Sequence, residues 1–407
     1  MIALLLVVLI NFVGIGALIP VIPYTVVDEF GYSETIMSAL LASFSLAMFL
    51  SNPILGRLSD QFGRRRLLII ALALNTVAHL WFALSEDIVS LFAARILAGI
   101  GAGNIGIIQA MLVERSKTED RARIMGLLGA AIGAGFVLGP ALGGLFSGLG
   151  GGPVHQVPFF IAAGFGAIAM ILCLRLPARP SQASAQPTAA EHASAPIEKT
   201  ALLPRLLQLM AGPLGWFALA FFLLNLSFAQ VEASFVLLVK DLMGFTARDT
   251  GWLFTYIGVC IIVVQGGLIG VLVKKLGEMT VILLGAGALC GGQFLTVLFA
   301  RYGMDFSLPM LAQLVILTTI ICVGFALTNP TLSAASSRVA KTEDMGGALG
   351  LVQGFGSLGQ VFGLILAGPL YEMGGGMANY GFGGIITLGL LIVAYHLLAK
   401  LYRPAAS

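Results

Sequence analysis

Charged residues are scarce in this sequence. Asp, Glu, Lys and Arg make up only 10% of the 407 residues, whereas hydrophobic residues make up 58% and the mean hydropathy is +0.99. Such a composition excludes a soluble globular protein and is typical of a chain that crosses a membrane many times. The net charge of only +3 gives no reason to expect a nucleic-acid partner.

The residues of catalytic and metal sites are also few. The four cysteines all lie in apolar runs, without a CxxC pair or a His/Cys cluster, so they are interpreted as small packing residues. The sequence contains no nucleotide-binding loop and no nucleophile–base pair. It therefore predicts a protein that is not an enzyme and that needs neither a cofactor nor a metal.

Long apolar runs dominate what remains. Each is close to the ~20 residues that a membrane-spanning helix needs, and backbone groups in lipid must pair internally. The first run follows Met1 without a basic segment, which favours a span over a cleavable signal peptide. Twelve spans are predicted, at 2–25, 35–56, 67–84, 89–113, 124–148, 157–176, 214–239, 251–273, 279–300, 308–330, 346–371 and 380–399.

Lys and Arg predict the orientation. Of the 22 such residues, only Lys240, Arg248 and Arg301 fall in odd-numbered connections and only Arg95 lies inside a span away from its cytoplasmic end. Because basic residues concentrate on the cytoplasmic side, both termini are predicted to lie in the cytoplasm.

Two halves flank a linker. Residues 178–203 are rich in Ala, Ser, Pro and Gln, which indicates a flexible cytoplasmic connection whose sequence at 181–198 is dispensable. The chain should thus divide into six-helix bundles at 1–177 and 204–407. The halves repeat each other, because Lys117–Asp120 and Lys341–Asp344 are both Lys-Thr-Glu-Asp. A parallel repeat of six spans is typical of secondary transporters.

A basic, glycine-containing segment follows the second span. It reads Gly-Arg-Leu-Ser-Asp-Gln-Phe-Gly-Arg-Arg-Arg from Gly56 to Arg66, and a weaker copy runs from Gly270 to Glu278. Its glycines permit a tight turn, and its arginines keep the turn in the cytoplasm. The segment resembles the loop between helices 2 and 3 of the major facilitator superfamily.

A series of small residues occupies the fifth span. Its spacing matches the antiporter motif of the twelve-helix drug:proton antiporter branch of that superfamily, and Gly350, Gly359, Gly363 and Gly368 form a weaker copy. Small residues let membrane helices approach closely, and a proline bends them, so simple packing is the alternative interpretation. The motif residues are Gly126, Gly135, Gly139, Pro140, Gly143 and Gly144.

The resemblance covers residues 5–400 apart from the linker and extends to the tetracycline:proton antiporter-like group. It implies that Asp60 caps the N-terminus of the eleventh helix, near Gly346, when the inner side is closed. Glu114 and Arg64 or Arg66 should complete that network. Arg64 and Arg66 also fit a role in topology alone. The implied gating set is Gly56, Asp60, Gly63, Arg64, Arg66 and Glu114.

Two charged residues inside spans are candidates for proton coupling. Arg95 begins Arg-Ile-Leu-Ala-Gly, which resembles the arginine motif of helix 4 in proton-coupled members, and a static ion pair is the alternative. Glu232 is the only acid well inside a span; it either couples protons or binds cations, or it is an inert interfacial carboxylate.

Polar side chains in the first, seventh, eighth and eleventh spans either line a central cavity or bond neighbouring helices. Gln353, Ser357 and Gln360 share one face. The candidates are Asn11, Tyr24, Asn225, Tyr256, Gln265, Gln353, Ser357 and Gln360.

The chain departs from the tetracycline pumps at two positions. Those pumps carry an acid where Asn11 stands and a histidine where Ile261 stands, and an amide does not titrate. Tetracycline is therefore not the expected substrate.

The sequence favours a monomeric transporter of the bacterial inner membrane that exports amphipathic small molecules in exchange for protons. Its expected partners are the small-molecule substrate, protons and the lipid bilayer. A lipid or lysolipid translocator of the same fold is one alternative, and a non-transporting receptor or assembly factor is another.

Overall fold

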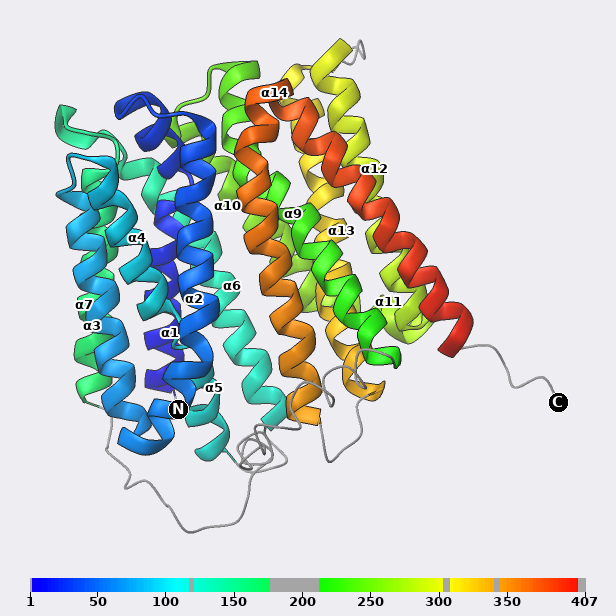
Figure 1. Ribbon diagram of the computed structural model, residues 1–407, viewed down its shortest axis with the longest axis horizontal. Coiled ribbons are helices and arrows are strands. Elements are labelled where there is room, and N and C mark those ends of the chain that lie inside the picture. Colours follow the sequence, from blue (N-terminus) through cyan, green and yellow to red (C-terminus); the bar gives the residue numbers. More distant parts are fainter. Residues whose placement is uncertain (1, 117–120, 176–211, 303–307, 340–344, 402–407) are drawn as a thin grey trace. The chain divides into compact units, whose positions relative to one another are not determined.

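The computed structural model describes residues 2–116, 121–175, 212–302, 308–339 and 345–401, and these form helices and short connections without a strand. Helices satisfy their own backbone groups, which a lipid solvent requires. Figure 1 shows them as α1 (Ile2–Leu18), η1 (Tyr24–Glu29), α2 (Glu34–Phe62), α3 (Arg64–Ala83), α4 (Ile88–Ala102), α5 (Ile105–Glu114), α6 (Arg121–Phe146), η3 (Leu149–Gly151), α7 (Gln156–Leu174), α9 (Pro213–Met243), α10 (Ala247–Val263), η4 (Val264–Leu268), α11 (Ile269–Leu276), α12 (Glu278–Tyr302), α13 (Met310–Val339) and α14 (Met345–Leu401).

The described helices account for the twelve predicted spans. Ten helical segments among the described residues are long and apolar enough to cross a membrane, and α1 is a shorter apolar helix. The long α14 contains two helical stretches, because the backbone at Gly374 and Gly375 is not helical. The all-helical membrane fold predicted from composition is confirmed.

Two predicted spans contain breaks that hydropathy does not reveal. The first span ends as α1 at Leu18, and the π-helix η1 follows after Pro20 and Pro23, because proline lacks the N–H that a continuous helix needs. The fourth span divides into α4 and α5 at Gly103 and Asn104. A Cβ at Gly103 would overlap Ser51 Oγ, so the neighbouring helix α2 requires glycine there.

The predicted loop at Gly56 is much shorter in the structure. Helix α2 continues to Phe62 and α3 starts at Arg64, so Gly63 alone makes the turn, with φ +94°. The prediction that Gly56 lies in the loop is wrong: it lies inside α2, whose polar end continues beyond the apolar run. The weaker copy of this segment, Gly270–Glu278, has the same geometry, since Gly277 separates α11 from α12 with φ +80°.

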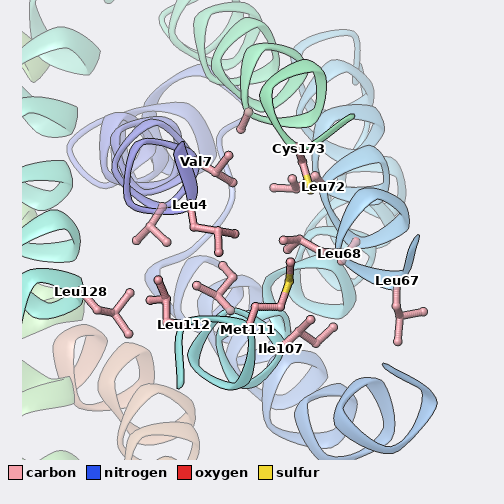
Figure 2. Close-up of a cluster of buried hydrophobic side chains, with 14 of the residues drawn as sticks. Leu4, Val7, Leu67, Leu68, Leu72, Ile107, Met111, Leu112, Leu128 and Cys173 are labelled. Carbon is pink, nitrogen blue, oxygen red and sulfur yellow. The ribbon is translucent and has the colours of Figure 1, made fainter. Parts of the chain in front are cut away.

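The chain divides into two compact units, Met1–Ala183 with Phe235–Ile262, and Ser184–Ser234 with Val263–Ser407. In the first unit, α1 packs against α6 and α7, and α3 packs against α4 and α7. Figure 2 shows an apolar cluster of this unit, where side chains from α1, α3, α5, α6 and α7 converge. Buried members include Leu4, Leu68, Leu112, Leu128 and Cys173.

In the second unit, α12 packs against α13 and α14. Helix α9 belongs to this unit up to Ser234, and the end of α9 with most of α10 belongs to the first unit. Three sets of predicted features lie outside the described residues: the linker at 178–203, the bundle boundaries beside it and both Lys-Thr-Glu-Asp copies.

The Gly63 turn yields a prediction with a control in the same helix. Gly63→Ala should lower the thermal unfolding temperature of the purified protein, since an L-residue at positive φ costs about 1–2 kcal/mol. Gly56→Ala lies in helix with no atom near the new methyl group, so it should leave stability unchanged or raise it. Equal unfolding temperatures for the two variants would contradict the assignment of the turn to Gly63.

Candidate functional site

Arg64 lies at the centre of a charged cluster at the start of α3. Its guanidinium is 3.2 Å from Asp60 Oδ1 and 3.1 Å from Glu114 Oε1. The arginine side chain is only 19% exposed, whereas both acids are about half exposed. One cation thus ties the end of α2 and the end of α5 to the tight turn at Gly63. The structure brings three of the predicted gating residues together, while Arg66 is exposed and the capping of the eleventh helix by Asp60 stays a prediction.

Arg65 has a contact that the sequence did not suggest. It donates hydrogen bonds to the carbonyl oxygens of Cys173 and Leu174, the last residues of α7. Carbonyls at a helix C-terminus lack intrahelical partners and carry partial negative charge, which a guanidinium satisfies. The neighbouring arginines of one turn therefore bind different elements of the first unit.

The second unit repeats the Arg64–Glu114 pair with the charges exchanged. Glu278 begins α12 directly after the Gly277 turn, and its Oε1 lies 2.9 Å from the guanidinium of Arg338 near the end of α13. The carboxylate side chain is 5% exposed and the arginine 70%. In each unit, an ion pair thus joins the tight glycine turn to the end of another helix, but the cation and the acid have changed places.

The antiporter motif lies on α6, which continues through Pro140. A Cβ on Gly135 would lie 2.5 Å from Phe12 Cβ, and one on Gly139 would lie 2.7 Å from Gly16 Cα. A Cβ on Gly143 would overlap the carbonyl oxygen of Ala17. These glycines therefore hold the backbones of α6 and α1 together. Gly126 lies near the start of the same helix.

The next residue of the motif faces a different helix. A Cβ on Gly144 would lie 2.8 Å from both the carbonyl oxygen of Ala247 and Gly251 Cα, and a Cβ on Gly251 would lie 2.7 Å from the carbonyl oxygen of Pro140. The end of α6 is thus in backbone contact with α10 as well as with α1. Adjacent glycines can serve two neighbours because successive helical residues point in different directions.

The weaker copy of the motif has the equivalent contact in the second unit. A Cβ on Gly359 of α14 would overlap the carbonyl oxygen of Phe222, and one on Gly363 would lie 2.7 Å from the carbonyl oxygen of Leu226, both on α9. The fifth and eleventh spans therefore pack on the first and seventh through glycine. The repeat seen in the sequence is also a repeat of helix contacts.

Arg95 lies inside α4 and is 7% exposed. Its guanidinium carbon is 4.4 Å from the centroid of the Phe44 ring on α2, a cation–π contact that gains strength where water is excluded. Gly99, one turn later, has no room for a Cβ against the carbonyl oxygen of Phe44. The charge is thus held at the α2–α4 contact. This position is compatible both with a role in proton coupling and with a static structural role for Arg95.

Glu232 has a defined partner in the second unit. Gln360 Nε2 of α14 donates to Glu232 Oε2 of α9 at 3.1 Å, and both side chains are half-buried. Two turns earlier, Asn225 Nδ2 donates to the carbonyl oxygen of Phe221 and lies beside Gly356. A carboxylate inside a span therefore faces an amide donor on the neighbouring helix, and the amide satisfies part of its hydrogen-bonding capacity.

The remaining cavity candidates have varied surroundings. Asn11 is 4% exposed and accepts a hydrogen bond from Asn75 Nδ2 at 3.5 Å, so it joins α1 to α3. Gln353 is exposed and donates to Ser333 Oγ at 3.4 Å, and Ser357 donates to the carbonyl oxygen of Gln353. Tyr24 is buried against α10, Tyr256 is 37% exposed on α10, and Gln265 is exposed in η4.

Sequence reasoning missed a buried polar network in the second unit. Ser227 Oγ lies 2.7 Å from Thr387 Oγ1, and Gln293 Nε2 donates to the Ser227 hydroxyl. Gln230 donates to the carbonyl oxygen of Gly363 and accepts from Asn379. The signal was available, because Ser227 and Gln230 are three residues apart and share a face of α9.

These geometries define a polytopic helical membrane protein with two glycine-packed repeats. Residues 4–312 match the Major Facilitator Superfamily, and the chain belongs to this superfamily. Multidrug resistance protein 1 of Bacillus subtilis is 30% identical over 373 residues, covering 89% of this chain and 87% of that protein. Quinolone resistance protein NorA of Staphylococcus aureus is 25% identical over 396 residues, covering 94% and 92%.

A solved structure agrees on the fold. The human organic anion transporter MFSD10 superimposes with a TM-score of 0.68 at 21% identity, covering 96% of this chain and 98% of that one. The family resemblance inferred from the basic loop and the glycine spacing is confirmed.

The α1–α6 contact can be tested directly. Gly143→Ala should reduce the yield of folded, monodisperse protein, because its methyl group overlaps the Ala17 carbonyl and overpacking costs about 1–3 kcal/mol. Gly129→Ala in the same helix is the matched control, since no atom lies within 4 Å of its new methyl group. Size-exclusion chromatography and thermal unfolding measure both. A Gly143→Ala protein as stable as Gly129→Ala would show that the two helices pack differently.

Proposed function

We propose that this protein exports amphipathic, drug-like molecules from the cell in exchange for protons. The main observation behind this proposal is the similarity of nearly the whole chain to Multidrug resistance protein 1 and NorA. The intact glycine motif and its close contact with α1 support the antiporter branch rather than an uptake carrier. Neither the lipid translocator nor the receptor alternative is favoured by these relatives. The chain carries out transport rather than a chemical conversion.

We further propose that transport proceeds by alternating movement of the six-helix halves at 1–177 and 204–407, in a monomer whose termini both lie in the cytoplasm of a bacterial inner membrane. The excess of Lys and Arg in the even-numbered connections supports this orientation. The Arg64 cluster then lies on the cytoplasmic side, where Asp60 is suited to hold the inner gate closed. The lipid bilayer surrounds the apolar exposed surfaces of the spans.

Glu232 is the proposed residue for proton coupling or for binding a substrate's positive charge. It is half-buried within α9, and the amide of Gln360 orients one carboxylate oxygen. Arg95 is less suited to exchange protons, since a guanidinium stays protonated, and it is proposed to position α4 against α2 through Phe44. Three further polar residues are proposed to contact the substrate, because they lie on the helices that carry the Glu232–Gln360 pair. They are Asn225 on α9 and Gln353 and Ser357 on α14.

Transport by the purified protein in liposomes tests the function and the role of Glu232 together. With the lumen acidic, an amphipathic cationic dye should accumulate inside, and a protonophore should abolish the accumulation. Glu232→Gln keeps a hydrogen-bonding partner for Gln360 but loses the charge, so its accumulation should lose most of its dependence on the pH gradient. Glu86→Gln, at an exposed acid between α3 and α4, is the control and should behave as the parent.

Two results would contradict these proposals separately. If the parent protein moves dye at the same rate with and without a pH gradient, the proposal of proton exchange is wrong, whereas the dye flux itself still supports export. If Glu232→Gln retains the full pH dependence, the carboxylate is interfacial and the coupling group lies elsewhere.

A further inference from the structure

Two adjacent acids at the end of η1 bind two different elements of the first unit. Asp28 forms an ion pair with Lys240, near the end of α9. Glu29 lies 2.8 Å from His155 Nδ1, and it also accepts the backbone N–H of Val154. Successive residues on a helix do not face the same neighbour, so one short π-helix contacts both the α9 end and the segment before α7.

Tyr24, at the start of η1, makes a further contact with the segment after α9. Its hydroxyl donates to the carbonyl oxygen of Phe245 at 2.7 Å and lies 2.9 Å from Thr250 Oγ1. Beneath these bonds, the buried side chains of Tyr24, Val236 and Ala247 form a small apolar cluster. The α9–α10 hairpin, Phe235–Ile262, is therefore held to the first half of the chain by an ion pair, a tyrosine and an apolar contact.

The two contacts of η1 differ in how easily they can separate. Lys240 and Asp28 are 30% and 40% exposed, whereas His155 and Glu29 are 4% and 21% exposed. An exposed ion pair contributes little to stability because water replaces its contacts, but breaking a hydrogen bond to a buried side chain leaves a polar group without a partner. A surface cavity of about 520 Å³, lined by Tyr24, Asp28, Lys240 and Phe245, adjoins the exposed pair. The geometry therefore allows Asp28 and Lys240 to part while Glu29 and His155 remain bound.

We propose that Tyr24, Asp28 and Lys240 form an outer latch, which closes the extracellular side by holding the α9–α10 hairpin, and that Glu29 and His155 anchor η1 in place. The proposal rests on the proposed function, since alternating access requires an outer gate and cytoplasmic termini put η1 outside. The latch opens once per cycle by separation of the exposed pair and release of the Phe245 carbonyl from the tyrosine. No residue of this latch belongs to the basic loop or to the glycine motif.

A buried reporter residue can detect opening without any transport measurement. Ala247 is 5% exposed and lies in the apolar cluster under the latch. Ala247→Cys is placed in a protein whose Cys173, Cys260, Cys290 and Cys322 are replaced by alanine, and intact cells are treated with a membrane-impermeant maleimide. The rate of labelling then reports how often the hairpin separates from Tyr24.

Asp28→Asn should speed labelling about two- to fivefold, the range that an exposed ion pair allows. Tyr24→Phe should speed it about tenfold, because the partly buried Phe245 carbonyl loses its donor. The exchanged pair, Asp28→Lys with Lys240→Asp, should restore slow labelling. Glu86→Gln, which neutralises an exposed acid in the α3–α4 connection, should leave the rate unchanged.

Unchanged labelling in both Asp28→Asn and Tyr24→Phe, with folded protein in the membrane, would overturn the latch. Faster labelling that also occurs in Glu86→Gln and that the exchanged pair does not reverse would show general loosening, which also overturns it. Labelling confined to inverted vesicles would overturn the assignment to the outer side. The expected labelling pattern in a protein that moves no dye in liposomes would uphold the latch and reject the proposed drug export.

Discussion

The rest of this structure depends on the close approach of helix backbones, because a lipid solvent provides little hydrophobic force between helices. A leucine side chain gains almost no free energy when it moves from contact with lipid to contact with another leucine. Helix packing must therefore come from van der Waals contact and hydrogen bonds. Glycine brings whole backbones within reach of each other. The α1–α6 contact at Gly135, Gly139 and Gly143 has this form, and so does the α9–α14 contact at Gly359 and Gly363.

The second unit supplements glycine packing with buried hydrogen bonds. Ser227, Gln293 and Thr387 bond one another across α9, α12 and α14, and Gln230 bonds Asn379 and a backbone carbonyl. Amides and hydroxyls inside lipid must find partners, so a network of this kind fixes which faces of the helices meet. The half-buried pair of Glu232 and Gln360 lies on two of these helices, α9 and α14, and their positions therefore depend on the network.

Hydropathy and local spacing predict the helices but not their interruptions. The twelve spans follow from apolar runs of sufficient length, and a cytoplasmic turn within Gly56–Arg66 follows from its glycines and arginines, although its place at Gly63 does not. Neither the end of α1 at Leu18 nor the length of α2 could be placed, because a helix continues beyond the membrane wherever its polar residues still bond internally. Contacts between residues distant in sequence could not be predicted. Nothing near His155 or Lys240 indicates that each contacts an acid of η1, since such pairs arise only once the helices have packed.

The two halves make one kind of helix contact with the charges exchanged. Arg64 and Glu278 both begin a helix after a one-residue glycine turn, and their partners Glu114 and Arg338 both stand near the end of their own helices, α5 and α13. An ion pair has the same attraction whichever partner carries the positive charge, so the helix contact survives the exchange. The surroundings of the two pairs differ. Among the described residues, buried Glu278 is paired with one cation, whereas Arg64 is paired with two half-exposed acids. The first unit therefore keeps a carboxylate, Asp60, that can leave Arg64 without leaving the arginine unpaired. The described partner of Glu278 offers no such reserve, so breaking that pair would leave a buried charge without a partner.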